Sequence, residues 1–241
     1  PEVHTIAADM RAIADSYVAD GRGERVLIGE VYLPVDRLMH YYGRERPGVH
    51  LPFNFQLIDA PWDARSLAKL IADYEAALPP GGWPNWVLGN HDRPRVATKR
   101  GQAQARVAAM LLLTLRGTPT IYYGDELGLS DVPIPTSQVQ DPRELREPGL
   151  ALGRDPVRTP MPWHGNENSG FTTGRPWLPL NADCRTRNVA AMANDPHSIL
   201  MLYHRLLAAR RAHLALSTGD FTLVDAEGDV LAYERRHGTE R

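Results

Sequence analysis

Residues 86–92 read Trp86-Val87-Leu88-Gly89-Asn90-His91-Asp92, a short apolar stretch that stops on polar side chains. A similar stretch lies upstream, where Arg25-Val26-Leu27-Ile28-Gly29-Glu30 ends on a glutamate. Strands that are apolar on both faces are typical of a parallel sheet with helices on each side. The carboxyl ends of such strands are where barrel enzymes assemble their acid/base residues. The two stretches therefore predict an α/β fold with Glu30 and Asp92 as candidate catalytic carboxylates.

Strands and helices alternate through the first half of the sequence. Apolar residues at helical spacing predict helices at about 3–18, 67–78 and 102–115, and short apolar runs predict strands at 26–28, 50–57, 86–88 and 118–123. This order indicates βα units on a parallel sheet. Four strands are half of the eight that a closed barrel of this kind requires.

The second half has a different character. Nine prolines fall between residues 133 and 179, and a loop of this length in a compact chain is usually functional or disordered. We expect an ordered loop because it holds three large aromatic residues, Trp163, Phe171 and Trp177. A helix is predicted from about residue 196, followed by a β-hairpin with strands at 221–224 and 230–233.

Composition excludes several classes of protein. The 241 residues carry 27 Lys and Arg against 29 Asp and Glu, so nothing favours binding to nucleic acid or to an anionic membrane. A single cysteine, Cys184, excludes an internal disulfide and a cysteine-rich metal site. No apolar run is long enough to span a membrane. We expect a cytoplasmic protein with no metal and no cofactor.

The run Gly89-Asn90-His91-Asp92 has interpretations other than acid/base catalysis at a strand end. It is also a signature of two-metal phosphoesterases, in which the Asn and His are metal ligands. That chemistry needs further ligands upstream, whereas Gly124-Asp125 and Gly219-Asp220 lie downstream and lack the second aspartate. His91 and Asp92 could also simply cap the next helix and hold a loop.

Polar or charged segments follow three of the predicted strands in chain order. Glu30 follows one strand, Asn90-His91-Asp92-Arg93-Pro94-Arg95 follows another, and Gly117-Thr118-Pro119-Thr120-Ile121-Tyr122-Tyr123-Gly124-Asp125-Glu126 comes next. The loop adds Gln140-Asp141-Pro142 and Gly153-Arg154-Asp155-Pro156-Val157-Arg158-Thr159-Pro160-Met161-Pro162-Trp163. Together these motifs resemble glycoside hydrolase family 13, the α-amylase family, and the loop motifs resemble its exo-acting α-glucosidase and oligo-1,6-glucosidase branch.

The resemblance implies a fold and a domain division. It implies the C-terminal half of a (β/α)8 TIM barrel, strands five to eight, over residues 1–213, including the long loop 131–195. Residues 214–241 would then begin an antiparallel β domain. The missing N-terminal half of the barrel is the partner that such a fragment requires.

The resemblance also implies roles for individual residues. Glu30 would be the general acid/base. Asp92 would bind sugar hydroxyls and stabilise the oxocarbenium-like transition state. His91 would donate to the same sugar, and Arg95 and Arg158 would bind sugar hydroxyls or orient carboxylates. Asp141 would lie in a loop that shapes the site. Asp125 and Glu126 are interpreted as structural.

The family's nucleophile is an aspartate on the fourth strand, two residues after an arginine. Asp15 and Asp20 lack that arginine, so we expect the nucleophile upstream of Pro1 and an isolated chain without activity. Three functions remain open. The parent enzyme hydrolyses α-glucosidic bonds in oligosaccharides or disaccharides, or it is a transglycosylating relative (trehalose-forming or sucrose-acting), or it is a non-catalytic amylase-like interaction protein. The retained Glu30 and Asp92 argue against the last.

Overall fold

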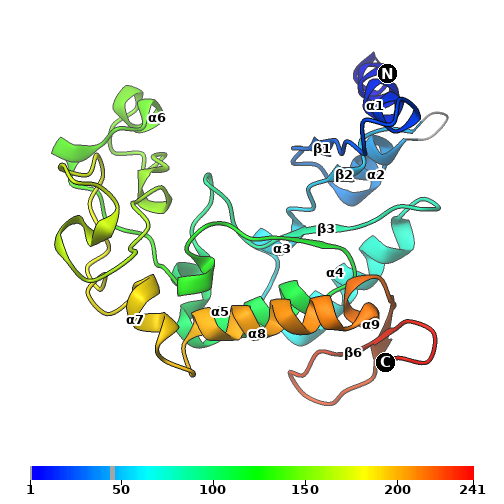
Figure 1. Cartoon of the computed structure of the whole chain (residues 1–241). Helices are drawn as coiled ribbons and strands as arrows, with labels where there is room; N and C mark the ends of the chain where they lie inside the picture. The colour runs from blue at the N-terminus through cyan, green and yellow to red at the C-terminus, as the bar shows by residue number, and fades with distance from the viewer. Residues whose placement is uncertain (1, 44–46) are drawn as a thin grey trace. The chain divides into compact units, whose positions relative to one another are not determined.

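The computed structural model describes residues 2–43 and 47–241, which fold into two compact units (Figure 1). The first unit takes in the described residues up to Val87 together with Leu115–Thr120 and Leu214–Arg241, and the second takes in Leu88–Thr114 and Ile121–His213. The chain therefore leaves the first unit at the end of one strand, returns to it for another, and returns again at Leu214.

The first unit contains the strands. Its elements are α1 (Glu2–Ala19), β1 (Ile28–Gly29), α2 (Val35–Tyr42), β2 (Leu51–Pro52), α3 (Gln56–Asp59), α4 (Ala64–Ala77), β3 (Asn85–Val87), β4 (Thr118–Thr120), α9 (Leu214–Ser217), β5 (Asp220–Val224) and β6 (Ala232–Arg236). The second unit consists of helices and loops. Its elements are α5 (Val96–Thr114), η1 (Asp125–Leu127), η2 (Thr136–Gln138), α6 (Pro142–Arg146), η3 (Asp155–Val157), η4 (Glu167–Gly170), α7 (Val189–Ala193) and α8 (Ile199–Ala212).

The predicted parallel strands are confirmed in the first unit. β1 pairs in parallel with β2, and β3 pairs in parallel with β4, with Trp86 opposite Pro119. A parallel bridge between Asn54 and Trp86 links the two pairs, so the strands follow one another in chain order. Phe55, Ile58 and Val87 pack together beside this junction. Parallel neighbours in this order are the arrangement that βα units produce.

The second predicted strand, 50–57, is wrong in its length. The strand covers only Leu51–Pro52, and α3 begins at Gln56. Pro52 has no backbone N–H to donate to a ladder, and the Asn54 side chain accepts a hydrogen bond from the Gln56 backbone N–H at 3.0 Å. This local turn bends the chain into a helix where the apolar pattern alone predicted a continuing strand.

The core of the second unit lies between its helices. α5 and α8 run side by side, as Figure 1 shows, and contact one another along their length. Leu127, Leu129, Met161 and Leu200 form a buried cluster next to them. α5 begins earlier than predicted, but Gly101 breaks its regular helical geometry with a positive φ of 81°. The predicted helix from residue 102 is therefore the part after this kink.

The long loop is ordered, but the three aromatic residues are not what holds it. Trp163, Phe171 and Trp177 are 50%, 44% and 62% exposed. The buried apolar residues of the loop are small or aliphatic, among them Val157 and Leu178. The loop also contains short helices, such as α7 with five residues. Helices this short show no clear periodicity in the sequence, and the same is true of the eight-residue α2 in the first unit.

The C-terminal hairpin forms with a different second strand. β6 begins at Ala232 and continues to Arg236, whereas the predicted strand began at Val230, which is 59% exposed. Arg235 is buried and donates to the carbonyl oxygens of Gly219 and Asp220. The Asp229 side chain accepts a hydrogen bond from the Ala64 backbone N–H at 2.6 Å. This contact holds residues near Asp229 in the turn and moves the strand start toward the C-terminus.

We predict that the isolated 241-residue chain self-associates. Five apolar residues of α1 are half exposed or more, and they recur at helical spacing: Val3, Ile6, Met10, Ile13 and Val18. Exposed apolar stripes of this size drive association. Light scattering should show oligomers, and an apolar dye should bind. A monodisperse monomer with a sharp thermal transition would contradict this.

Within the described residues, no helix combines the length and apolar character needed to cross a bilayer.

Candidate functional site

A tight turn follows β3 and presents the predicted site residues. The Asn90 side-chain oxygen accepts a hydrogen bond from the backbone N–H of Asp92 at 2.9 Å. An Asx turn of this kind fixes the backbone without a helix or a strand. His91 is exposed, and its Nε2 lies 3.4 Å from Oδ1 of Asp92. The turn therefore holds both side chains in a defined place at the surface of the second unit.

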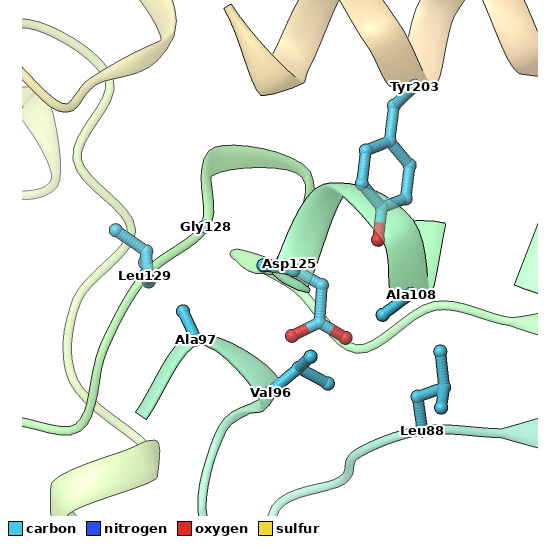
Figure 2. Close-up of a pocket in the computed structure, with 9 residues that line it drawn as sticks. Leu88, Val96, Ala97, Ala108, Asp125, Gly128, Leu129 and Tyr203 are labelled. Atoms are coloured by element: carbon cyan, nitrogen blue, oxygen red, sulfur yellow. The ribbon is translucent and has the colours of Figure 1, made fainter. Parts of the chain in front are cut away.

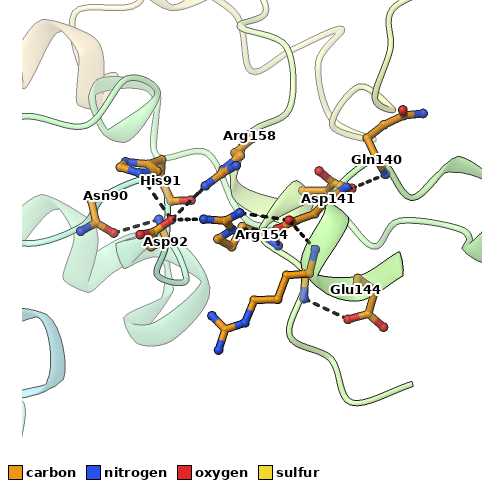
Figure 3. A network of polar contacts seen from close by, with 11 residues as sticks. Asn90, His91, Asp92, Gln140, Asp141, Glu144, Arg154 and Arg158 are labelled. Carbon is orange, nitrogen blue, oxygen red and sulfur yellow. Dashed lines mark hydrogen bonds and ion pairs between the residues drawn. The ribbon is translucent and has the colours of Figure 1, made fainter. Parts of the chain in front are cut away.

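Two arginines from the long loop hold one oxygen of the Asp92 carboxylate (Figure 3). Nη2 of Arg158 donates to Oδ1 of Asp92 at 2.9 Å, and Nη1 of Arg154 donates to the same oxygen at 3.2 Å. Arg158 also donates through Nε to the His91 carbonyl oxygen at 2.9 Å. Within the second unit, the described residues offer no hydrogen-bond donor to the other oxygen, Oδ2. Both arginine contacts are therefore made at Oδ1, and the Asp92 side chain is 31% exposed.

Arg154 is itself held by Asp141. Its Nε and Nη2 donate to the two carboxylate oxygens of Asp141 at 2.7 and 3.0 Å, a bidentate pair. The Asp141 side chain has no exposed surface, and it also accepts the backbone N–H groups of Arg143 and Arg154. The hydrogen bonds from Arg154 hold the pKa of Asp141 well below its usual range, and the pKa of Arg154 is raised in turn. Both groups are charged throughout the physiological range.

A second buried aspartate organises the backbone around this pair. One carboxylate oxygen of Asp155 accepts the backbone N–H groups of Gln140 and Asp141, at 2.6 and 2.8 Å. Asp141 in turn caps the N-terminus of α6, with Pro142 at the first helical position. The two ends of this part of the loop are therefore tied to each other through carboxylates.

The predicted site residues fall into three groups. The structure brings His91, Asp92 and Arg158 together. Asp141, predicted to lie in a loop that shapes the site, is held in the interior, where it supports Arg154. Glu30 directly follows β1 in the first unit and is exposed. Its approach to Asp92 remains a prediction.

Arg95 occupies the interior of the second unit and not its surface. It is 1% exposed, and its guanidinium donates to the carbonyl oxygens of Tyr123 and Val157 at 2.6 and 2.7 Å. The guanidinium also lies over the rings of Tyr122 and Tyr123, 4.9 and 4.8 Å from their centres. A guanidinium in this position does not reach a sugar. The expected contact with sugar hydroxyls is therefore corrected to an internal supporting role.

Asp125 lies in the same interior, next to a cavity of about 10 Å³ (Figure 2). The cavity is otherwise lined mostly by apolar side chains, and the Tyr203 side chain reaches into it from α8. Burial raises the pKa of Asp125 to about 7, while the charge of Arg95 opposes this rise and the charge of Glu126 adds to it. The interpretation of Asp125 as structural agrees with this placement.

We predict that Asp125 makes stability depend on pH. Its pKa rises from 3.8 to about 7 in the folded state, so the folded chain keeps a proton that the unfolded chain loses between these values. The free energy of unfolding should therefore fall as pH rises from about 4 to 7, by up to about 1.4 kcal/mol per pH unit. Asp125→Asn should remove this part of the slope. Urea unfolding at pH 5 and pH 8 measures it, with exposed Asp225→Asn as the control. Equal slopes in wild type and Asp125→Asn would contradict the prediction.

The sequence did not identify Arg154 as a member of the candidate site. It lies in the quoted motif Gly153-Arg154-Asp155, yet only Arg158 of that stretch was predicted to act in the site. Arg154 is 62 residues away from Asp92 in the chain. The available signal was a second arginine in the same motif as the predicted Arg158, but only the folded loop reveals which carboxylates Arg154 contacts.

A profile of the alpha-amylase catalytic domain matches residues 1–219. A salivary alpha-glucosidase of Anopheles gambiae is 35% identical over 98% of this chain and 41% of its own length. An oligo-1,6-glucosidase of Parageobacillus thermoglucosidasius is 28% identical over 100% of this chain and 49% of its own length. The chain thus spans less than half the length of these relatives.

Solved structures of similar fold include enzymes that transfer or rearrange glucosyl groups. An alpha-glucosyl transfer enzyme, XgtA, has a TM-score of 0.88 and 33% identity, covering 99% of this chain and 44% of its own. The trehalulose synthase MutB has a TM-score of 0.85 and 31% identity, covering 98% of this chain and 49% of its own. These enzymes are TIM barrels, and the chain corresponds to part of one. By its sequence, its parallel strands and its match to the catalytic domain, the chain belongs to the alpha-amylase family.

Proposed function

We propose that this chain is part of a retaining α-glucosidase that acts on oligosaccharides or disaccharides. The observation that carries the proposal is the Asp92 carboxylate, held at Oδ1 by Arg154 and Arg158 while its side chain stays 31% exposed. A carboxylate presented in this way can accept a hydrogen bond from a sugar hydroxyl without moving. Preorganised groups of this kind stabilise charge that develops in the transition state.

In this proposal Glu30 is the general acid/base. Retaining hydrolysis requires a carboxylic acid that protonates the leaving oxygen and then deprotonates a water molecule. Glu30 follows a strand directly, where a barrel enzyme carries such a group. His91 and Arg158 would bind the same sugar beside Asp92. The nucleophile would be the aspartate on the fourth barrel strand of the family. The 241 residues contain no aspartate two residues after an arginine, which is the motif of that nucleophile.

Transglycosylation is the second candidate. It is supported by structural neighbours that include an alpha-glucosyl transfer enzyme and a trehalulose synthase. Hydrolysis and transfer share the glycosyl-enzyme step and differ in whether water or a sugar attacks it. A non-catalytic interaction protein has less support, because a binding scaffold has no need of Glu30 or of a clamped Asp92.

Product analysis with the whole protein tests the proposal. With sucrose, isomaltose and an aryl α-glucoside as substrates, ¹H NMR should show α-glucose as the first product. Formation of new disaccharides at high sucrose, without free glucose, would establish the transferase. No turnover of any α-glucoside by the whole protein would refute both.

We further predict that Glu30 and Asp92 converge on one sugar. In a crystal structure of the whole protein with a glucose-like inhibitor, both carboxyl groups should contact the inhibitor. The prediction rests on two parallel strand pairs joined by a parallel bridge, because the carboxyl ends of strands in this arrangement point the same way. Side chains on opposite edges of the sheet would overturn the assignment of both residues.

A further inference from the structure

We infer that Arg154 is a positioning residue that aims the Asp92 carboxylate and that Asp141 holds it in place for this task. The inference rests on the proposed function, because it assigns a purpose to the orientation of Asp92. Asp141, Arg154 and Asp92 form a chain of contacts, as Figure 3 shows. The Asp141 side chain has no exposed surface, whereas the Asp92 side chain is partly exposed.

The guanidinium of Arg154 is committed to protein partners. Nε and Nη2 are used by the bidentate pair with Asp141, and Nη1 donates to Asp92. These contacts fix the guanidinium between two carboxylates, one of which has no exposed surface. In this inference Arg154 acts through Asp92, whose carboxylate it orients.

Arg154 and Arg158 differ in what anchors them. Arg158 is held by Asp92 and by the His91 carbonyl oxygen, which belong to the same turn. Arg154 is anchored outside that turn, on the buried Asp141. Only Arg154 therefore ties the orientation of Asp92 to a rigid part of the long loop. Without it, the carboxylate can rotate about its own side-chain bonds while Arg158 follows.

The anchor at Asp141 is rigid for a physical reason. Its carboxylate accepts two backbone N–H groups in addition to the guanidinium of Arg154. Its own backbone N–H is held by Asp155 at 2.8 Å. A supporting group whose own hydrogen bonds are all made holds the side chain next to it within a narrow range of positions.

Kinetics of the whole enzyme test the inference. Arg154→Gln should lower kcat by about 10- to 100-fold and change KM less than about threefold, because a misaimed Asp92 loses transition-state contacts more than ground-state ones. Arg154→Lys should restore little, since an ammonium cannot reproduce the planar bidentate pair with Asp141 while it also reaches Asp92. Arg146→Gln is the matched control, because Arg146 is an exposed arginine of the neighbouring α6.

A double-mutant cycle separates positioning from general support. If Arg154 acts through Asp92, then Arg154→Gln should cost almost nothing further in an Asp92→Asn background. Fully multiplicative losses would overturn the inference, as would an Arg154→Gln enzyme indistinguishable from the Arg146→Gln control.

A structural readout holds whether or not the enzyme is a glucosidase. The crystal structure of the Arg154→Gln protein should show the Asp92 carboxylate rotated or in two orientations, with the backbone of residues 88–95 unchanged. An Asp92 carboxylate that keeps its position would overturn the inference even in an active enzyme. Absence of activity in wild type, with a rotated Asp92 in the variant, would refute the proposed function and leave the positioning role standing.

Discussion

Glu30→Gln in the whole protein should lower kcat on an alkyl α-glucoside by about 100- to 10,000-fold, the usual contribution of a general acid. The amide has the size of the carboxyl group but cannot donate a proton to the leaving oxygen. A glucoside whose leaving group needs no protonation should be affected much less in its first half-reaction. Comparing the two substrates by burst kinetics separates loss of the acid from misfolding.

The matched control for this experiment is Glu24→Gln, an exposed glutamate shortly before β1. It should leave kcat unchanged. The isolated 241-residue chain should show no turnover, because a retaining double displacement cannot begin without a nucleophile. Turnover by the purified chain that is lost on Glu30→Gln would contradict this. The nucleophile would then lie among the carboxylates of this chain, with Asp92 the first to test.

Arg95→Met should lower the free energy of unfolding by about 3–5 kcal/mol at pH 8, the usual cost of removing one member of a buried pair of opposite charges. Arg95 is 1% exposed, and its charge opposes the rise in the pKa of Asp125. Without that charge the Asp125 carboxylate is buried with no cation to offset it, and two backbone carbonyl oxygens lose their donor. Urea unfolding followed by circular dichroism measures the change.

The same variant should show a smaller loss at pH 5. Asp125 has a pKa of about 7, so at pH 5 it is protonated and needs no compensating charge. Adding Asp125→Asn should recover part of the loss at pH 8. Arg146→Met, on the exposed surface of α6, is the control and should stay within about 0.5 kcal/mol of wild type. A loss for Arg95→Met that is the same at both pH values would show that packing, and not charge, explains it.

The parallel strands were predictable because their signals are local. Apolar stretches between helical patterns predicted β1, β3 and β4 to within a few residues. The prediction failed where single side-chain hydrogen bonds, one local and one between distant parts of the chain, outweighed the apolar pattern. The Asn54 side chain ended β2 early, and the contact from Asp229 to the Ala64 backbone N–H shifted the second strand of the hairpin.

The candidate site was predictable in its residue types and less so in its contacts. Asp92, His91 and Arg158 were identified from motifs, and the structure brings these three together. Arg95 was identified from the same kind of motif, yet it is buried. A motif records that a residue type is needed at a position, but it does not say whether the side chain faces a substrate or the interior.

By itself, the amino-acid sequence determined the membership in the alpha-amylase family, the parallel order of the strands and the carboxylates at strand ends, because these depend on residue type and local spacing. Only the tertiary structure decided which cations hold Asp92. Arg154 and Arg158 lie 62 and 66 residues from it along the chain. Contacts at such separations depend on how the long loop folds back over the turn after β3. That path is set by buried carboxylates such as Asp141, whose partners no local pattern predicts.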